Sequence, residues 1–266
     1  MSKKGIDVSV HNGKINWDKV KADGIEFAII RVGYGSDIAS QTDKQALYNA
    51  QECDRLGIPY GLYLYSNAIS VSKAHSEAQH MLRIARQTNP TLGLWYDMED
   101  ADGYKVKHNF APKQHKEELT NFCKIFMEDL KEAGYDNVGV YANADYFKNI
   151  LDIEELRRHG KIWLAHWNIS EPSIPCNIWQ HTSKGKVNGI NGNVDLDILY
   201  DDIKVEQKYY DVPDFTLIES LNKIGVDSSY NNRKKIATGN GIEDYKGTAE
   251  QNLKLLDMLQ KGILKR

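Results

Sequence analysis

LGLWYDMED, residues 92–100, is a short apolar run that ends in three carboxylates within four positions. A run of this length is typical of a buried strand, in which alternate side chains point to the same side. Asp97 and Glu99 are therefore expected on one face, with Cα atoms roughly 6.5–7 Å apart. Two interpretations stay open: the pair marks the solvated end of a strand, or the two carboxyls work together.

Strand-like runs alternate with helical patterns over the first 200 residues. They lie at 6–10, 27–32, 60–65, 93–96, 138–141, 162–165 and 178–180. This alternation predicts βα units and a largely parallel sheet. So many strands in a segment of this length favour a closed or nearly closed barrel over an open sheet. The helical pattern weakens after 144–151, so loops are expected to join the last strands.

Two of the intervening helices have start and stop signals. TDKQ at 42–45 has the capping-box pattern and predicts a helix that ends near Gly57. In residues 111–135, Pro112 suits the first turn and Gly134 suits the stop. The apolar stripe expected to face the core consists of Leu119, Phe122, Cys123, Phe126 and Leu130.

The β/α pattern ends near residue 200, which divides the chain into three parts. Residues 1–200 are predicted to form the barrel, the polar stretch 201–214 a linker, and 215–266 a module of three short helices. Apolar residues at helical spacing in the module are Leu217, Ile218, Leu221 and Ile224, then Leu253, Leu256 and Leu259. About fifty residues make a marginal domain, so self-association or docking onto the larger domain would stabilise it.

Composition and charge exclude several classes of protein. The chain is 41% hydrophobic and 27% charged, and its net charge of −3 gives no global attraction to nucleic acid. The three cysteines, an odd number without metal or disulfide spacing, fit a reducing compartment and predict no metal or other cofactor. With no apolar signal segment and no stretch long enough to span a bilayer, we expect a protein made in a cytoplasm without stable membrane association.

Two further carboxylates lie in strands that are otherwise apolar. Asp7 is in GIDVSV and Asp195 in GNVDLDIL. A carboxylate in a hydrophobic strand is unfavourable unless it faces a wet cleft, although a structural hydrogen-bonding role for Asp7 stays open. The carboxyl ends of barrel strands form one rim, where all four carboxylates are expected to meet. Glycoside hydrolysis needs such a pair, with one carboxyl kept protonated by the charge of the other.

The chain resembles the glycoside hydrolase family 25 lysozymes, the Chalaropsis-type muramidases common among phage endolysins. Six stretches carry the resemblance, in order: GIDVSVHNGKINWDKVKADGIEFAIIRVGYG, YGLYLYSNA, LGLWYDMED, VGVYAN, IWLAHW and IWQHTSKGKVNGINGNVDLDIL. Roughly residues 4–200 are covered. The resemblance implies an irregular β/α, TIM-like barrel. It also implies cleavage of the β-1,4 bond between N-acetylmuramic acid and N-acetylglucosamine in peptidoglycan, by an endolysin that lyses the wall of a Gram-positive host.

Position by position, the resemblance implies that Glu99 is the general acid and Asp97 its partner carboxylate. Asp7 and Asp195 match two further active-site aspartates that orient the substrate. Asp197 is a rival for the place of Asp195. Either a single displacement by water or a substrate-assisted route through the 2-acetamido group fits this pair, because carboxyl separation depends on rotamers. We favour the substrate-assisted route.

Aromatic residues near the predicted rim are candidates for sugar binding. Tyr63 matches a tyrosine that lines the family's site. Leu64 follows it where the family often has histidine, which puts the wall of that subsite in doubt. In LAHW, His166 and Trp167 replace the commoner Gln-Tyr. Further side chains that could stack on sugar rings, with packing as the alternative, are Tyr34, Tyr65, Tyr141 and Trp167.

The C-terminal module resembles the small wall-binding modules of endolysins from phages that infect clostridia and related Gram-positive bacteria. Residues 215–266 hold nine basic and six acidic residues, against 25 and 31 in residues 1–214. A basic tail on an acidic body suggests an anionic wall polymer as target, with Arg233, Lys234 and Lys235 as candidate contacts and solvated surface as the alternative. Tethering would raise the local substrate concentration.

Two other functions stay open at this point. One is a catalytically silent glycan-binding barrel, whose carboxylates only hydrogen-bond to sugar hydroxyls; the presence of all four carboxylates counts against it. The other is a hydrolase of a different N-acetylated polymer, such as chitin.

Overall fold

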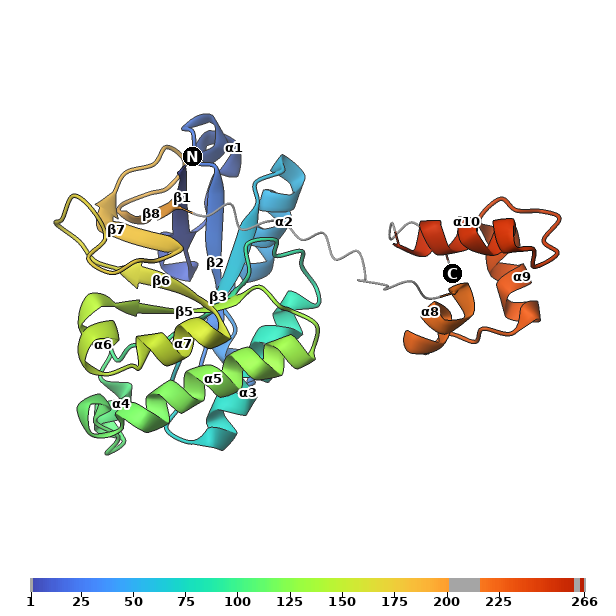
Figure 1. Cartoon of the computed structure of the whole chain (residues 1–266). Coiled ribbons are helices and arrows are strands. Elements are labelled where there is room, and N and C mark those ends of the chain that lie inside the picture. Colours follow the sequence, from blue (N-terminus) through green and yellow to red (C-terminus); the bar gives the residue numbers. More distant parts are fainter. Residues whose placement is uncertain (1, 201–215, 261–263, 266) are drawn as a thin grey trace. The chain divides into compact units, whose positions relative to one another are not determined.

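The computed structural model describes residues 2–200, 216–260 and 264–265 (Figure 1). The chain divides into two compact units, Met1–Val205 and Glu206–Arg266. The predicted linker at 201–214 lies outside the described residues. In the part of the chain that is described, no helix combines the length and the apolar character needed to cross a lipid bilayer.

The first unit is a closed eight-stranded barrel, which confirms the predicted α/β barrel fold. Neighbouring strands follow sequence order. The first seven run parallel to one another, whereas β8 runs antiparallel to both β7 and β1, so the barrel is irregular. The strands are β1 (Lys3–Val8), β2 (Phe27–Tyr34), β3 (Tyr60–Tyr65), β4 (Leu94–Asp97), β5 (Val138–Asn143), β6 (Lys161–Ala165), β7 (Ile178–Gly185) and β8 (Val194–Leu199).

Helices lie outside the strands (Figure 1). The α-helices are α1 (Trp17–Ala22), α2 (Ala46–Leu56), α3 (Val71–Ala85), α4 (Tyr104–Lys107), α5 (Lys116–Glu132), α6 (Ala144–Asn149) and α7 (Ile153–His159). Three short 3₁₀ turns are η1 (Val10–Asn12), η2 (Ala39–Gln41) and η3 (Pro112–Gln114). Loops join β6 to β7 and β7 to β8, as predicted. The predicted stripe of α5 is buried.

The capping box predicted at 42–45 is wrong. Helix α2 begins at Ala46 and has no side-chain cap. The Thr42 hydroxyl instead bonds to His80 and Arg83 of α3. The Asp43 carboxylate accepts the side chain of Arg31 at 2.9 Å. Tertiary partners therefore take the Thr42 hydroxyl that the capping box requires, while Asp43 Oδ1 also accepts the Gln45 N–H just before the helix. The predicted end is correct, because Gly57 adopts the left-handed conformation after Leu56.

Two apolar layers pack against the barrel wall, one on its outside and one on its inside. The larger layer packs the outward-facing strand residues against the helices. The smaller layer fills the barrel with side chains that include Phe27, Trp95 and Trp163. Glycines opposite the large rings make room for them: a Cβ at Gly139 would lie 2.4 Å from the Trp95 ring, and one at Gly5 would lie 2.3 Å from the Phe27 ring. The barrel interior is therefore filled by side chains, and a site can form only at an end of the barrel.

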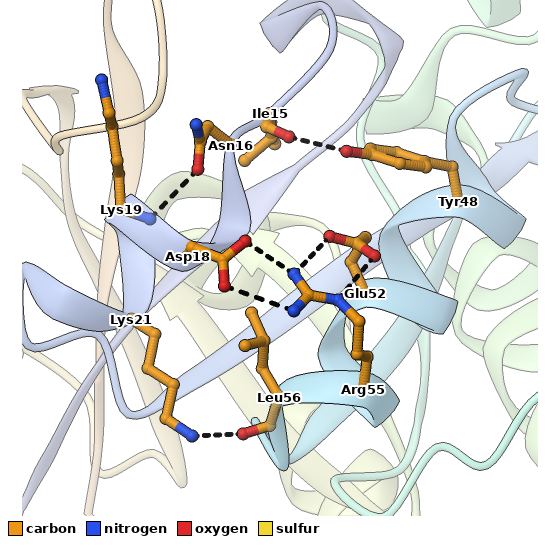
Figure 2. A network of polar contacts seen from close by, with 9 residues as sticks. All are labelled: Ile15, Asn16, Asp18, Lys19, Lys21, Tyr48, Glu52, Arg55 and Leu56. Atoms are coloured by element: carbon orange, nitrogen blue, oxygen red, sulfur yellow. Dashed lines mark hydrogen bonds and ion pairs between the residues drawn. The ribbon is translucent and has the colours of Figure 1, made fainter.

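Exposed ion pairs join α1 to α2 on the outside of the barrel (Figure 2). The Arg55 guanidinium donates to both carboxylate oxygens of Asp18, at 3.2 and 2.7 Å, and to both of Glu52, at 3.0 and 2.8 Å. The Tyr48 hydroxyl and the Lys21 ammonium add hydrogen bonds to backbone carbonyls of the facing segments. Arg55 lowers the pKa of both carboxyls.

The second unit has its own apolar core, formed by α8 (Leu217–Lys223), α9 (Tyr230–Gly239) and α10 (Ala249–Gln260). The predicted apolar faces are partly wrong. Leu217, Leu221 and Leu256 are buried, but Ile218, Ile224 and Leu253 are 41%, 40% and 63% exposed. Leu255 and Tyr245 complete the core. Helical spacing includes these exposed residues because a three-helix unit this small covers only a narrow stripe of each helix.

Arg233 is half-buried and hydrogen-bonds within this unit. Its guanidinium donates to the Tyr245 hydroxyl and to the Asn252 side chain, both at 2.9 Å, and to the Ser228 carbonyl at 3.0 Å. Of the three predicted basic contacts, only Lys234 and Lys235 are exposed.

Candidate active site

The predicted carboxylates gather at one end of the barrel. Asp7 and Asp97 lie near the carboxyl ends of the parallel strands β1 and β4. Strand β8 runs the opposite way, so its first residues reach the same end, and Asp195 pairs in register with Asp7. Burial raises the pKa of Asp7 and of Glu99, and the charge of Asp195 adds to both shifts. The closed barrel therefore brings together four carboxyls from three separate strand ends.

The sequence suggested that the strand continues to Glu99. In the structure β4 ends at Asp97. The alternation nevertheless continues beyond the strand. Met98 donates its N–H to the Tyr141 carbonyl at 2.9 Å, and its side chain is buried in the outer apolar layer. Asp97 and Glu99 thus share the inner side. Asp100, the third carboxylate of this stretch, turns away and accepts backbone N–H groups at the start of α4.

Burial controls the protonation of the Asp97–Glu99 pair. It raises the pKa of Glu99 to about 7, with Lys105 opposing the rise. Burial and the charge of Glu99 raise the pKa of Asp97 well above the ordinary value, and Lys105 and Arg31 oppose this. Interacting carboxyls titrate as a pair, and burial favours the protonated form of both. Asp97 Oδ1 is buried and has no hydrogen-bond partner among the described residues.

A second set of polar contacts holds Asp7. Gln180 of β7 donates from Nε2 to Asp7 Oδ2 at 2.8 Å. The amide oxygen of Gln180 accepts the Tyr141 hydroxyl and the Trp167 indole N–H, both at 3.1 Å. Because both ends of the amide are occupied, its orientation is determined, and Asp7 is held in place from β7, two strands away around the barrel.

The structure separates the roles of Asp195 and Asp197. Asp195 is half-buried at the rim, and burial raises its pKa to about 6. Asp197 lies one inward-facing position deeper, opposite Gly5, and is 1% exposed. It accepts the Trp163 indole N–H at 2.8 Å, and burial raises its pKa to about 8. Asp195 is therefore accessible from the open end, whereas Asp197 lies beneath it.

Four of the five aromatic candidates lie beside this cluster, within reach of its charges or of Gln180. The pKa of the Tyr63 hydroxyl is raised by burial and then by the charge of Asp7. Burial raises the pKa of Tyr141 and Tyr65, and Asp97 and Glu99 add to both shifts. Trp167 is 44% exposed beside Gln180.

Tyr34 is the fifth candidate. It is 42% exposed and pairs in register with Tyr65. It lies beyond an irregularity in the pairing of β2 with β3, after the inward-facing Arg31. It therefore lies at the rim, next to Tyr65.

Two departures from the family pattern have different consequences. Leu64 is fully buried in the outer layer, because it alternates with the inward-facing Tyr63 and Tyr65. Histidine in place of Leu64 would therefore not line the site. His166 bonds to Ser173 at 2.6 Å beside Trp167, so it supports the loop after β6.

Sequence reasoning missed Gln180, Arg31 and Lys105. Gln180 is an amide in an otherwise apolar run, IWQHTS, which is the signal that could have identified it. Arg31 is held at 2.9 Å by Asp43, and its charge reaches Asp97. Within the described residues, no group of three or more His, Cys, Asp or Glu side chains is arranged to hold a metal ion.

Comparison with known proteins identifies the family. The family model of glycosyl hydrolases family 25 matches residues 6–190. The chain belongs to glycosyl hydrolases family 25. This confirms the predicted enzyme class.

Family 25 relatives align over most of the barrel. The "Autolytic lysozyme" of Clostridium acetobutylicum is 28% identical over 198 residues, which are 73% of this chain and 55% of the relative. The autolysin LytC of Streptococcus pneumoniae, solved with a synthetic peptidoglycan ligand, is 30% identical with a TM-score of 0.66. That match covers 75% of this chain and 47% of LytC. The chain spans 55–66% of the length of the first curated relatives it matches.

A third similarity is short. The "L-alanyl-D-glutamate peptidase" of Listeria phage A118 is 50% identical over 46 residues, which are 17% of this chain and 16% of the peptidase.

Proposed function

We propose that this family 25 chain is a lysozyme that hydrolyses the β-1,4 bond between N-acetylmuramic acid and N-acetylglucosamine in peptidoglycan. The observation that carries the proposal is the meeting of Asp7, Asp97, Glu99 and Asp195 at the open end of the barrel. The names of the relatives support the substrate, since one is called a lysozyme and LytC was solved with a peptidoglycan ligand.

Glu99 acts as the general acid. Its pKa of about 7 favours the protonated form at slightly acidic pH, where it gives its proton to the glycosidic oxygen as the bond to the anomeric carbon breaks. The resulting carboxylate then takes a proton from the incoming water. Because burial is the first cause of the raised pKa, closing the site over a glycan would favour the protonated acid further.

Asp97 stabilises positive charge at the reacting sugar. Its Oδ1 atom, buried without a partner among the described residues, is placed to accept the N–H of the 2-acetamido group. The acetamido oxygen then bonds to the anomeric carbon as the leaving sugar departs. Water attacks this carbon from the face that the leaving sugar left and breaks its bond to the acetamido oxygen. Asp7, held by Gln180, and Asp195 bind the sugar from the opposite wall.

Wall clearing and product analysis test the activity. Wild-type protein should clear purified Gram-positive walls and release reducing ends at muramic acid, whereas Glu99→Gln should be slower by about 10²–10⁴-fold. Glu132→Gln, which removes an exposed carboxylate from the end of α5, is the matched control and should clear walls normally. Equal clearing by Glu99→Gln would remove Glu99 as the acid. Activity on chitin in place of walls would assign another substrate.

The anomer of the first product tests the route. The substrate-assisted route retains the configuration of the anomeric carbon. An inverted first product would instead require direct displacement by water.

The second unit is proposed to be a cell-wall-binding module of a phage endolysin. The short similarity to a phage peptidase supports this, because a peptidase does not share the glycosidase reaction. The shared segment of 46 residues is also short enough to fit within the second unit. Exposed Lys234 and Lys235 are candidates for contact with an anionic wall polymer.

A fluorescent fusion tests the module. Residues 215–266 fused to a fluorescent protein should stain walls of the host, and the fluorescent protein alone should not. Lys234→Gln combined with Lys235→Gln should weaken staining if the polymer is anionic. Unstained walls would contradict the assignment.

A further inference from the structure

Lys105 is fully buried, which is unusual for lysine. It lies in α4, the four-residue helix that follows the carboxylate stretch 97–100. Asp100 accepts the backbone N–H of Lys105 at 2.7 Å and that of Val106 at 3.2 Å. The third carboxylate of LGLWYDMED thus has a structural role, since it fixes the start of the helix that carries Lys105.

The Lys105 ammonium binds two backbone carbonyls next to the site. It donates to the Ser66 carbonyl at 2.5 Å and to the Glu99 carbonyl at 2.7 Å. Ser66 follows β3 and Glu99 lies just beyond β4, so one cation connects the ends of two neighbouring strands. Hydrogen bonds from a charged donor are stronger than those between neutral groups, and this one fixes the backbone of the proposed acid.

Acidic groups surround this cation on several elements. Burial lowers the pKa of Lys105, whereas Glu77 of α3, then Asp100 and Asp97, favour its charged form. Cys123 of α5 also faces it, and the Tyr65 ring centroid lies 6.0 Å from Nζ.

Glu77 is as deeply buried as Lys105. It accepts the Tyr96 hydroxyl at 2.5 Å, the Ser66 hydroxyl at 3.0 Å and the Asn67 N–H at 2.8 Å. Burial raises its pKa to about 7. Lys105 could have either of two roles. It could be the counter-ion of Glu77, or it could position and charge-stabilise the Asp97–Glu99 pair.

Building on the proposed lysozyme function, we propose that Lys105 is a positioning residue of the reaction: it fixes the backbone at Glu99 and supplies a buried positive charge beside the Asp97–Glu99 pair. The contacts favour this role because its ammonium hydrogen-bonds to the Glu99 carbonyl, whereas Glu77 already has three other donors. Its charge also lowers the pKa of both Asp97 and Glu99. Lys105 therefore opposes part of the effect of burial on both carboxyls.

Three variants separate the two roles. Lys105→Met removes the charge and keeps the length of the side chain. Glu77→Gln/Lys105→Met removes both buried charges, so that no carboxylate of α3 is left without its counter-ion. Lys107→Met is the matched control, because Lys107 is an exposed lysine of the same helix that bonds to the Asp102 carbonyl. Thermal melts of all three establish that the proteins are folded.

In wall-clearing kinetics, both variants that lack Lys105 should lose about 10–100-fold in kcat, with KM nearly unchanged because the buried ammonium is out of reach of substrate. Loss of the cation raises the pKa of Asp97 and of Glu99. The two limbs of the pH–rate profile, which report the coupled Asp97–Glu99 pair, should therefore both move to higher pH by about one unit. Lys107→Met should keep the wild-type profile. A double variant with wild-type kcat and pH profile would overturn the proposal and leave Lys105 as the counter-ion of Glu77.

A titration independent of activity completes the test. Carbon-13 NMR of the carboxyl groups, assigned with Asp97→Asn and Glu99→Gln, should show both groups titrating at higher pH in Lys105→Met and in the double variant. Unchanged titration would overturn the proposal. If the wild type fails to clear any wall, the proposed function fails, while the titration still decides what Lys105 does.

Discussion

Carboxylates in two regions of the barrel unit show opposite behaviour. On the surface between α1 and α2, Asp18 is met by both arms of Arg55, and its pKa is lowered. At the open end of the barrel, Asp97 has an oxygen without a partner among the described residues, and its pKa is raised by burial. The best-paired carboxylate is thus the exposed one, where pairing contributes little to stability.

The difference shows that the buried, incompletely paired carboxylates lie at the open end of the barrel, where they lower the stability of the fold. A protein selected for stability alone would pair its buried carboxylates or replace them with apolar residues. The barrel instead keeps Asp7, Asp97, Glu99, Asp195 and Asp197 close together, with Lys105 and Arg31 as partial compensation. Violations of this kind are expected at functional sites, because raised pKa values provide the acid that the chemistry needs.

The largest expected effect is on the rate of wall hydrolysis, which should depend on a carboxylate at the open end of the barrel and not on one between α1 and α2. Asp97→Asn and Asp18→Asn each replace one carboxylate by an amide of the same shape. Asp97→Asn should lower the rate of wall hydrolysis by about 10²–10⁴-fold, because the amide cannot stabilise positive charge at the sugar. Asp18→Asn should leave the rate unchanged. Equal rates for the two variants would show that the buried pair has no special part in the reaction.

A smaller effect is expected on the free energy of unfolding. Its pH dependence should have opposite signs for the carboxylates of the two regions. The folded-state pKa of Asp197, about 8, lies above the unfolded value of about 3.9. Its contribution to stability is therefore complete below that lower pH and is lost as the pH rises through 8. Asp197→Asn does not titrate and still offers an oxygen to Trp163, so at pH 8 it should be more stable than wild type by about 1–3 kcal/mol.

The pH series contains its own control. The advantage of Asp197→Asn should shrink towards pH 4, where the wild-type carboxyl is protonated in both states. Asp18→Asn should act in the opposite direction: the depressed pKa of Asp18 means that its contribution is present at neutral pH and is lost on acidification. Urea denaturation between pH 4 and 8 measures both. A stability difference for Asp197→Asn that does not change with pH would contradict the buried-charge explanation.

The smallest effect is expected for the surface pairs themselves. Arg55→Met removes the bonds to Asp18 and Glu52 shown in Figure 2. The midpoint of thermal unfolding should change by little more than the measurement error, and the change should vanish at high salt because the pairs are exposed. Differential scanning calorimetry at low and high salt provides the measurement. A large loss that persists at high salt would mean that the ion pairs fasten α1 to α2 more firmly than their exposure implies.

Short-range patterns in the sequence were sufficient for the barrel and for its principal carboxylates. Apolar runs located seven strands within a few residues, and the parallel βα rhythm placed their carboxyl ends together. Asp7, Asp97, Glu99 and Asp195 could be predicted because a charge in an apolar strand is unfavourable and therefore informative. The same reasoning applies to Gln180 in IWQHTS, where the polar residue is an amide.

Other features depended on contacts that no local pattern records. TDKQ does not cap α2, because Thr42 and Asp43 bond to α3 and to Arg31. Helical spacing in the second unit does not distinguish the buried Leu217 from the exposed Ile218, because the small core covers only a narrow stripe.

The sequence by itself determined the alternation of strands and helices, the family, and which carboxylates stand in apolar surroundings, since these follow from residue type and periodicity. Only the tertiary structure decided that Asp195 lies at the rim above the buried Asp197, that Leu64 faces away from the site, and that Lys105 lies behind the proposed acid. The physical reason is that burial and charge–charge distances are set by closure of the barrel, which brings together side chains that are far apart in the chain.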